Sequence, residues 1–393
     1  MARVRPREQQ LLANLLPLAL ALLLAARGAG GAAVNISNVL PRRTASGEVL
    51  EVADGNLLHH GGRYYLYGVR YQPCPVSEQA GCYNPCGYYN NTFAVYVSDD
   101  LSEGSWRLGS ASLVPAMDER GGPFSSASTV FFSPFVVHCR RTGLFVMWFQ
   151  FAFKMRAVAT SASPLGPFEI VRLPNATGLP PSLVNGSSVY LWVDDPGAGA
   201  GGEAYMLINL ILRGNETGSS QFVGRLTDDF LGVVPESVAP VAWDCEPPAQ
   251  SDPVGVNSRC FQEGGGIFRA GVEAGGAWFV LGGNGCCFCA RGADSKVWRS
   301  AGGPLGPYAH VGSLNAPLGP STPYNYTIPA QQFGVHAVRL ASGGVQPLYV
   351  GLRWGSGASK RTDMQYWAPI RVAADGLSLT ELQWQDSFVL DVA

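Results

Sequence analysis

The hexapeptide Ser163-Pro164-Leu165-Gly166-Pro167-Phe168 returns almost unchanged as Gly303-Pro304-Leu305-Gly306-Pro307-Tyr308, displaced by 140 residues along the chain. A near-duplicate at a fixed displacement is typical of proteins built from stacked equivalent units. The Gly-Pro pair in each copy is a strong turn signal. The two hexapeptides therefore predict equivalent turns in two copies of one structural unit.

A second pattern spans most of the chain and repeats about every 70 residues, half of the displacement between the hexapeptides. An apolar or aromatic run, a turn of glycine or polar residues, and a second run dense in aromatics occur together five times, and each set predicts a β-hairpin. One aromatic residue in each second run serves as a marker, and the spacings between markers are 80, 60, 74 and 70 residues, with an average of 71. The markers are Tyr65, Phe145, Tyr205, Phe279 and Tyr349.

A unit of about 71 residues is the size of one four-stranded blade with its loops. Five such units predict an all-β fold, a single five-bladed β-propeller over residues 48–392 with disulfide-stapled loops. A large irregular β-sandwich would also account for the strands, but not for the displacement of 140 residues.

The composition excludes several other classes. Charged residues make up 14% of the 393-residue chain, against about 25% in an average soluble domain. Helical bundles need more charge than this, and disordered chains need far less than the 47% of hydrophobic residues found here. With 27 basic and 29 acidic residues and no run of like charge, the chain has no electrostatic footprint for nucleic acid.

The first residues have the features of a secretory leader. Three arginines lie within residues 1–10, residues 11–26 are almost wholly apolar, and residues 27–33 are small. We expect a signal peptide over residues 1–33, a short lead-in over 34–47, and a secreted protein without stable membrane insertion after cleavage. The alternative is an uncleaved signal anchor that keeps the protein in the lumen of the secretory pathway.

Sequons and cysteines agree with that compartment. Six N-x-Ser/Thr sequons predict a glycosylated surface: Asn35, Asn90, Asn175, Asn185, Asn215 and Asn325. Nine cysteines are candidates for disulfide staples: Cys74, Cys82, Cys86, Cys139, Cys245, Cys260, Cys286, Cys287 and Cys289. Their odd number leaves either one free thiol or an intermolecular bridge. A metal site is disfavoured because no histidine flanks the cluster at 286–289 and adjacent cysteines are poor tetrahedral ligands.

The five strand entrances are where chemistry is expected. The first strand of each blade runs along the propeller axis, so residues at its start converge although they are far apart in sequence. The five entrances carry Asp54, Ser133, Ser188, Glu263 and the pair Gln331-Gln332. Two carboxylates in this set are the groups that acid and base catalysis of glycoside cleavage requires.

The ordered motifs carry a family resemblance. They are Asp54-Gly55-Asn56-Leu57, Gly62 to Gly68, Tyr96 to Leu101 with Trp106, Ser133-Pro134, Thr142 to Trp148, Ser163 to Phe168, Val193-Asp194-Asp195, Glu263-Gly264 and Arg353-Trp354. In order and spacing they resemble glycoside hydrolase family 43 over roughly residues 48–392. The Gly-Pro turns and the Arg-Trp pair look closest to the branch that includes exo-acting β-1,3-galactanases.

The resemblance implies an inverting glycosidase that acts on a polysaccharide or glycan. Glu263 takes the general acid position and Asp54 the general base position, with a water between carboxyls roughly 6.5–9.5 Å apart. Gln331 or Gln332 is an alternative base, and substrate-binding positions fall on Arg353, Trp354 and Ser188.

The expectations for cofactors and partners follow the same resemblance. No cofactor is required. A structural calcium ion at the axis is an open alternative, and His336 is a candidate axial ligand, although a hydrogen-bonded core histidine is the more common outcome. The protein is expected to be a monomer.

Two positions depart from the family pattern. Ser188 stands where the family carries a third acid, and Phe132 stands where the galactanase branch carries another. These departures support an alternative function, a carbohydrate-binding or adhesion propeller that has lost its catalytic set. A disulfide-stapled scaffold without a ligand is the third hypothesis.

Overall fold

The computed structural model describes residues 31–74, 87–184, 186, 188–194, 202–210, 220–241, 262–271, 276–284, 292–316, 318 and 326–393. They form five antiparallel sheets in sequence order and one terminal strand pair. Four of the sheets have four strands: β2 Leu57–His60, β3 Arg63–Arg70, β4 Thr92–Ser98 and β5 Arg107–Ser110; β6 Phe131–Cys139, β7 Leu144–Phe151, β8 Met155–Ser161 and β9 Glu169–Arg172; β10 Val189–Asp194, β11 Glu203–Asn209, β12 Gln221–Arg225 and β13 Ala239–Pro240; β14 Gln262–Ala270, β15 Ala277–Asn284, β16 Asp294–Ser300 and β17 Ala309–Ser313. The fifth sheet contains β18 Gln331–Arg339, β19 Val345–Arg353 and β20 Met364–Pro369.

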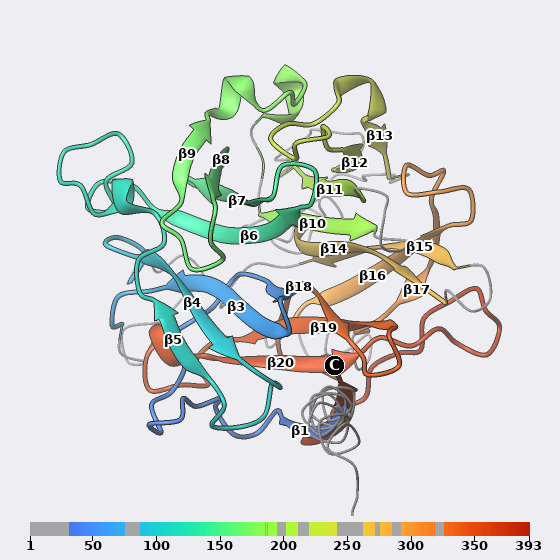
Figure 1. Cartoon of the computed structure of the whole chain (residues 1–393). Helices are drawn as coiled ribbons and strands as arrows, with labels where there is room; N and C mark the ends of the chain where they lie inside the picture. Colours follow the sequence, from blue (N-terminus) through green and yellow to red (C-terminus); the bar gives the residue numbers. More distant parts are fainter. Residues whose placement is uncertain are drawn as a thin grey trace, which may run out of the picture.

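The five sheets are the blades of one propeller (Figure 1). Each first strand contacts the first strand of the next blade, in the order β2, β6, β10, β14 and β18, and β18 returns to contact β2. The ring is therefore closed, and the predicted all-β five-bladed propeller is confirmed. Each of the five predicted hairpins is the pair formed by the first two strands of a blade.

The fifth blade differs from the predicted four strands. In the described residues it has only three, and a two-stranded sheet of β1 (Ala32–Ser37) and β21 (Ser387–Val392) lies beside it. Val392 bridges Leu340, which follows β18, and the Asn38 side chain hydrogen-bonds the backbone of Trp367 in β20. The two ends of the fold thus meet at this blade, and Figure 1 shows β1 close to the C-terminal end. The first 30 residues lie outside the described part, and β1 begins inside the range expected for the leader.

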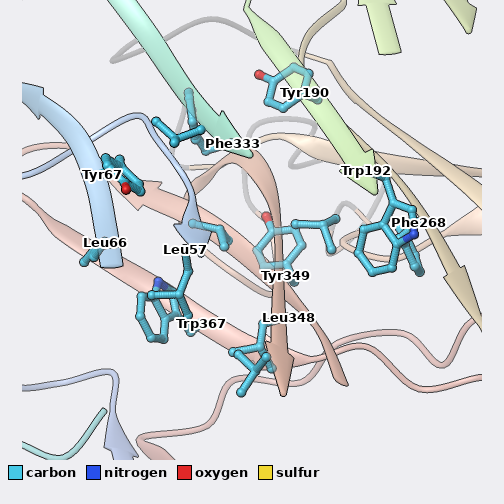
Figure 2. Packing of buried hydrophobic residues seen from close by; sticks show 14 of the residues in the cluster. Leu57, Leu66, Tyr67, Tyr190, Trp192, Phe268, Phe333, Leu348, Tyr349 and Trp367 are labelled. Atoms are coloured by element: carbon cyan, nitrogen blue, oxygen red, sulfur yellow. The ribbon is translucent and has the colours of Figure 1, made fainter. Parts of the chain in front are cut away.

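The core lies between blades rather than on one face of a sheet. Strands such as β7 are buried along almost their whole length, because each blade is covered by a neighbour on both sides. Figure 2 shows side chains from four blades meeting in this layer, among them Leu57, Tyr190, Phe268 and Tyr349. Such continuous burial explains why the second strands read as aromatic and aliphatic runs without polar alternation.

The two Gly-Pro hexapeptides occupy equivalent places. The first joins β8 to β9, and the second joins β16 to β17, so each connects the third and fourth strands of its blade. The Gly166-Pro167 and Gly306-Pro307 bonds are both cis, and the aromatic residue that follows each is buried. The equivalent turns predicted from the repeat are confirmed.

One cysteine departs from the expected staples. Cys139 is a buried free thiol, packed in an apolar cluster with its Sγ 3.5 Å from the Asp228 carbonyl oxygen. Including it among the disulfide candidates was wrong, because its side chain serves as part of the core of blades two and three. Cys74 is buried. The other seven candidates lie outside the described residues: Cys82, Cys86, Cys245, Cys260, Cys286, Cys287 and Cys289.

Three sequons can be placed. Asn35, Asn90 and Asn175 are exposed, whereas Asn185, Asn215 and Asn325 lie outside the described residues. An exposed side chain is what glycan attachment requires. The described residues include no helix with the length and apolar character needed to cross a membrane.

Candidate active site

Asp54 lies at the entrance of blade one with its carboxylate turned toward blade two. Its side chain is buried, and its φ of +59° is rare for a residue other than glycine. The backbone N–H of Ser133 donates to Oδ2 at 3.0 Å, and the Ser133 hydroxyl donates to Oδ1 at 2.9 Å. Because both oxygens accept hydrogen bonds, the contacts fit an ionised carboxylate. Ser133 is held in a left-handed conformation of its own, with a φ of +50°.

The residues that follow Asp54 fix its position. A side chain at Gly55 would overlap the backbone of Tyr67, so only glycine fits there. The Asn56 amide donates to the Val136 carbonyl oxygen at 2.9 Å and its oxygen accepts from the Val136 N–H at 2.8 Å. The buried Asn56 side chain therefore hydrogen-bonds the backbone of β6 as a neighbouring strand would, and it joins the first two blades. Its role was not predicted, although its place in the Asp-Gly-Asn motif was a signal.

Glu263 lies at the equivalent entrance of blade four. It is the second residue of β14, within an irregularity of register between Gln262 and Gly265. Gly264 has a φ of +87°, its carbonyl oxygen accepts from the Asn209 amide at 2.9 Å, and an added side chain would overlap the backbone of Gln332. The backbone of this entrance is thus packed between β11 and β18. The Glu263 side chain is outside the described part of the structure, so its separation from Asp54 stays a prediction.

The two candidate glutamines of blade five have different contacts. The Gln331 Oε1 atom accepts a hydrogen bond of 2.7 Å from the Trp354 indole N–H. Gln332 is fully buried, and its Oε1 accepts from the Ser295 hydroxyl. The Gln332 Nε2 atom has no hydrogen-bond partner in the described part of the structure. Gln331 and Trp354 are thus brought together at the entrance, whereas Gln332 faces blade four.

His336 joins the last blade to the first. Its Nδ1 accepts the Leu57 N–H at 3.3 Å, and its ring packs edge-to-face on Trp367 at 5.1 Å. Burial, with a smaller contribution from the Arg42 charge, lowers the pKa of His336 to about 3. The imidazole is therefore neutral and its Nδ1 lone pair is already engaged. No cluster of three or more His, Cys, Asp or Glu side chains that could hold a metal ion occurs within the described ranges.

Two other residues expected to bind substrate, Arg353 and Ser188, can also be placed. The Arg353 guanidinium donates to the Asn38 carbonyl oxygen at 2.7 Å and lies over the Trp384 ring at 5.0 Å. These contacts direct its charge to the lead-in rather than to Asp54. Ser188 is buried immediately before β10, at the entrance of blade three.

A buried arginine near that entrance was missed. The Arg156 guanidinium donates to the carbonyl oxygens of Leu183 and Asn209 at 3.1 and 3.0 Å. Burial lowers its pKa to about 10. Nothing in the local sequence distinguishes Arg156 from a surface arginine, because both carbonyl partners come from distant segments.

Phe132 precedes Ser133 and belongs to an aromatic cluster. Its ring centroid is 5.2 Å from that of Tyr88 and 5.7 Å from that of Phe153. The position that the family resemblance associates with an acid is therefore apolar in its surroundings as well as in its side chain.

Solved structures share this architecture. An exo-β-1,3-galactanase from Clostridium thermocellum superposes with a TM-score of 0.62 at 19% identity, over 91% of this chain and 67% of that one. The chain has the family 43 propeller fold. A family 43 β-1,3-galactosidase gives 0.61 at 18% identity over 91% of this chain, which spans 64% of that protein's length. An exo-β-1,3-galactanase variant from Phanerochaete chrysosporium, solved with β-1,3-galactotriose, gives 0.58 at 16% identity, over 90% of this chain and 67% of that one.

The comparisons by sequence find no relative of this chain. No protein-family sequence profile matches the chain, and no curated protein matches it in sequence. The family 43 propeller fold is therefore carried by the three-dimensional arrangement, and the chemistry must be argued from the residues at the strand entrances.

Proposed function

We propose that this protein is a glycoside hydrolase that cleaves O-glycosidic bonds of a polysaccharide or glycoprotein glycan by an inverting mechanism. The observation that carries the proposal is the Asp54 carboxylate, buried at a strand entrance and oriented by both donors of Ser133. A carboxylate held in this way can accept a proton from water without first having to reorient. Glu263, at the entrance of blade four, is the partner acid.

The proposed reaction balances with these two groups. Glu263 gives its proton to the leaving glycosidic oxygen, while Asp54 takes a proton from a water that attacks the anomeric carbon from the opposite face. The new C–O bond forms as the old one breaks, so the product has the inverted anomeric configuration. Gln331, held by Trp354, is the alternative group for orienting the water.

The class of substrate is also part of the proposal. Proteins of the same fold include β-1,3-galactanases solved with galactose and with β-1,3-galactotriose. We therefore take a β-1,3-linked galactan or a glycan with such branches as the first substrate to test. The leader-like first residues and three exposed sequons support a secreted, N-glycosylated protein. No cofactor enters this mechanism, and a monomer is sufficient for it.

A release assay tests the catalytic assignment. Sugar release from β-1,3-galactan, arabinan, xylan and aryl glycosides should fall by about 10²–10⁴-fold in Glu263→Gln and in Asp54→Asn, because each lacks one proton-transfer group. Glu381→Gln, which changes an exposed acid on another part of the molecule, is the matched control. NMR of the first product should give the inverted anomer. Equal rates in wild type and Glu263→Gln would remove the enzyme proposal.

A second function has its own supporting observation. Phe132 lies in an aromatic cluster and Ser188 is a buried hydroxyl, at two positions where the resemblance leads us to expect acids. A carbohydrate-binding propeller needs the entrance but not those acids. Measurable glycan binding without release by wild type would favour this second function over hydrolysis.

A further inference from the structure

A continuous arc of aromatic rings follows the strand entrances from blade five to blade two. The arc consists of Trp354, Tyr71, Tyr88, Phe132 and Phe153, and we call it the entrance arc. Its successive ring centroids are 6.2, 5.9, 5.2 and 5.7 Å apart. Aromatic rings at such distances form favourable pairs. The arc therefore connects three blades through residues that are far apart in sequence.

The arc passes beside the proposed base. Tyr71 follows β3, whose residue Val69 pairs with Ala53, the neighbour of Asp54. Phe132 is bonded to Ser133, whose hydroxyl and N–H hold the Asp54 carboxylate. A ligand in contact with Asp54 would thus lie next to Phe132 in the arc.

The exposed end of the arc is held in a strained conformation. Phe153 is 52% exposed and has a φ of +65°, and its neighbour Ala152 has a φ of +49°. A bulky residue in this region costs of the order of 1–3 kcal/mol and persists only where its surroundings enforce it. The Gln150 amide donates to the Phe153 carbonyl oxygen and also to that of Gly186, so the turn is tied to the entrance of blade three.

Packing into the core does not explain this strain. Tyr88 and Phe132 are partly buried against the main apolar cluster, but the Phe153 ring packs only on those two rings among its described aromatic contacts. Among the described residues, four of the seven non-glycine positions with positive φ are Asp54, Ser133, Ala152 and Phe153. They are connected through the Ser133 hydrogen bonds to Asp54 and the contact between the Phe132 and Phe153 rings. Ala152 and Phe153 are the central residues of the turn that joins β7 to β8, which the Lys154 N–H closes on the Phe151 carbonyl oxygen at 3.3 Å. Such a turn requires positive φ at both positions and favours glycine, asparagine or aspartate, so an exposed phenylalanine there points to a role for the ring itself.

We propose that Phe132, Phe153 and Tyr88 form a stacking platform for a pyranose unit of the glycan, next to the bond that Asp54 and Glu263 act on. The location relative to the scissile bond rests on the proposed function, whereas the platform itself rests on the rings. The C–H face of a pyranose packs on an aromatic ring as an apolar surface does. The buried Lys360 side chain places its Nζ atom 4.0 Å from the Tyr88 ring centroid, so this ring of the platform also makes a cation–π contact.

The platform also gives Phe132 a role. An acid at position 132 would hydrogen-bond a sugar hydroxyl, whereas a phenyl ring there selects for a C–H face. Phe132, Phe153 and Tyr88 are thus specificity-determining residues, and the departure at position 132 changes which face of the sugar is recognised.

Calorimetric titration with β-1,3-galactotriose tests the platform, in a Glu263→Gln background so that the probe is not consumed. Phe153→Asn removes the ring while tolerating positive φ. It should raise Kd by about tenfold, which corresponds to about 1.4 kcal/mol. Phe132→Leu should have a similar effect, whereas Phe153→Tyr, which keeps an aromatic ring, should bind as tightly as the background variant. Leu173→Asn, at a residue 51% exposed on blade two, is the matched control and should leave Kd unchanged.

The outcomes separate the platform from the catalytic assignment. Kd values for Phe153→Asn and Phe132→Leu equal to that of the background variant would overturn the platform. Binding that depends on Phe153 without any hydrolysis by wild type would keep the platform and remove the enzyme. Hydrolysis with a KM that neither Phe153→Asn nor Phe132→Leu changes would keep the enzyme and remove the platform. No binding and no hydrolysis would remove both.

Discussion

Neighbouring inner strands are joined by different means at two places around the ring. Between blades one and two, the side chains of Asp54 and Asn56 reach across to the backbone of β6. Between blades four and five the two glycines of β14 leave room for β18 to approach: Gly264 faces the backbone of Gln332, and Gly266 faces the side chain of Val335. The first junction depends on which polar groups are present, and the second depends on side chains being absent. The two proposed catalytic carboxylates lie one at each junction.

The largest effect is expected at the junction between blades four and five. Gly264→Ala would place a methyl group on the Gln332 carbonyl oxygen in a backbone conformation that already disfavours alanine. We expect the free energy of unfolding to fall by about 4 kcal/mol or more. Gly343→Ala is the matched control, because Gly343 has almost the same φ of +86° with no atom within 4 Å of the added carbon. It should cost only about 1–2 kcal/mol, and urea unfolding curves measure both. Equal losses would mean that close packing adds nothing at this junction.

The next effect is expected at the side-chain junction. Asn56→Ala removes two hydrogen bonds and leaves the buried N–H and carbonyl of Val136 without them. The free energy of unfolding should fall by about 2–3 kcal/mol, because unsatisfied buried backbone groups keep their desolvation cost. Gln383→Ala, at an exposed amide, should change it by less than about 0.5 kcal/mol. A loss at Asn56 no greater than at Gln383 would show that the side-chain bridge does not hold the blades.

A third junction, between blades five and one, should depend on pH through His336. Its pKa is about 3 in the folded protein, below the 6.5 of a free histidine. The unfolded chain therefore binds a proton below about pH 6.5 while the folded protein does not. Stability should fall by up to about 1.4 kcal/mol per pH unit as the pH drops from 6.5 toward 3.

The urea midpoint measured between pH 7 and pH 5 checks this. His336→Gln should be less stable at pH 7 but show a shallower decline. His310→Gln, at an exposed histidine, should leave the slope as it is in wild type. A slope that His336→Gln does not reduce would place the pH dependence elsewhere.

The smallest loss of stability is expected at Ser133, which holds the Asp54 carboxylate at the junction of blades one and two. Ser133→Ala removes the hydroxyl donor to Oδ1 and keeps the N–H donor to Oδ2. A hydrogen bond to a charged group contributes about 1.5 kcal/mol or somewhat more, so a loss of about 1.5 kcal/mol is expected. Ser342→Ala, at an exposed serine, is the control. If both variants retain wild-type stability in urea, the hydroxyl does not hold the carboxylate.

Much of the fold could be predicted from the sequence because the hairpins and turns of the blades depend on neighbouring residues. The hairpins follow from apolar runs separated by turns, and the Gly-Pro turns follow from a repeat that the blades preserve. The pairing of β1 with β21 could not be predicted, because its partners are separated by almost the whole chain and neither strand carries a pairing signal. The three-stranded fifth blade was missed for the same reason.

The site was predictable only where a motif marks it. Asp54 lies at its expected entrance, but the donors that hold it belong to a residue 79 positions away. His336 was considered as a metal ligand, and its contact with Leu57 depends on how the ring closes. The entrance arc combines rings from separate segments of the chain, so no spacing in the sequence indicates it.

The pairing of β1 with β21, which we call the seam, has a consequence for circular permutation of the chain. Ala32 pairs with Val392, so the two ends of the described fold lie side by side. A linker across this seam and a new opening at the exposed turn of Gly343 and Gly344 would give a circular permutant that retains every contact between blades. The order of the blades around the axis is thus independent of where the chain starts, and a reporter or binding module could be fused at the rim without separating the two proposed catalytic entrances.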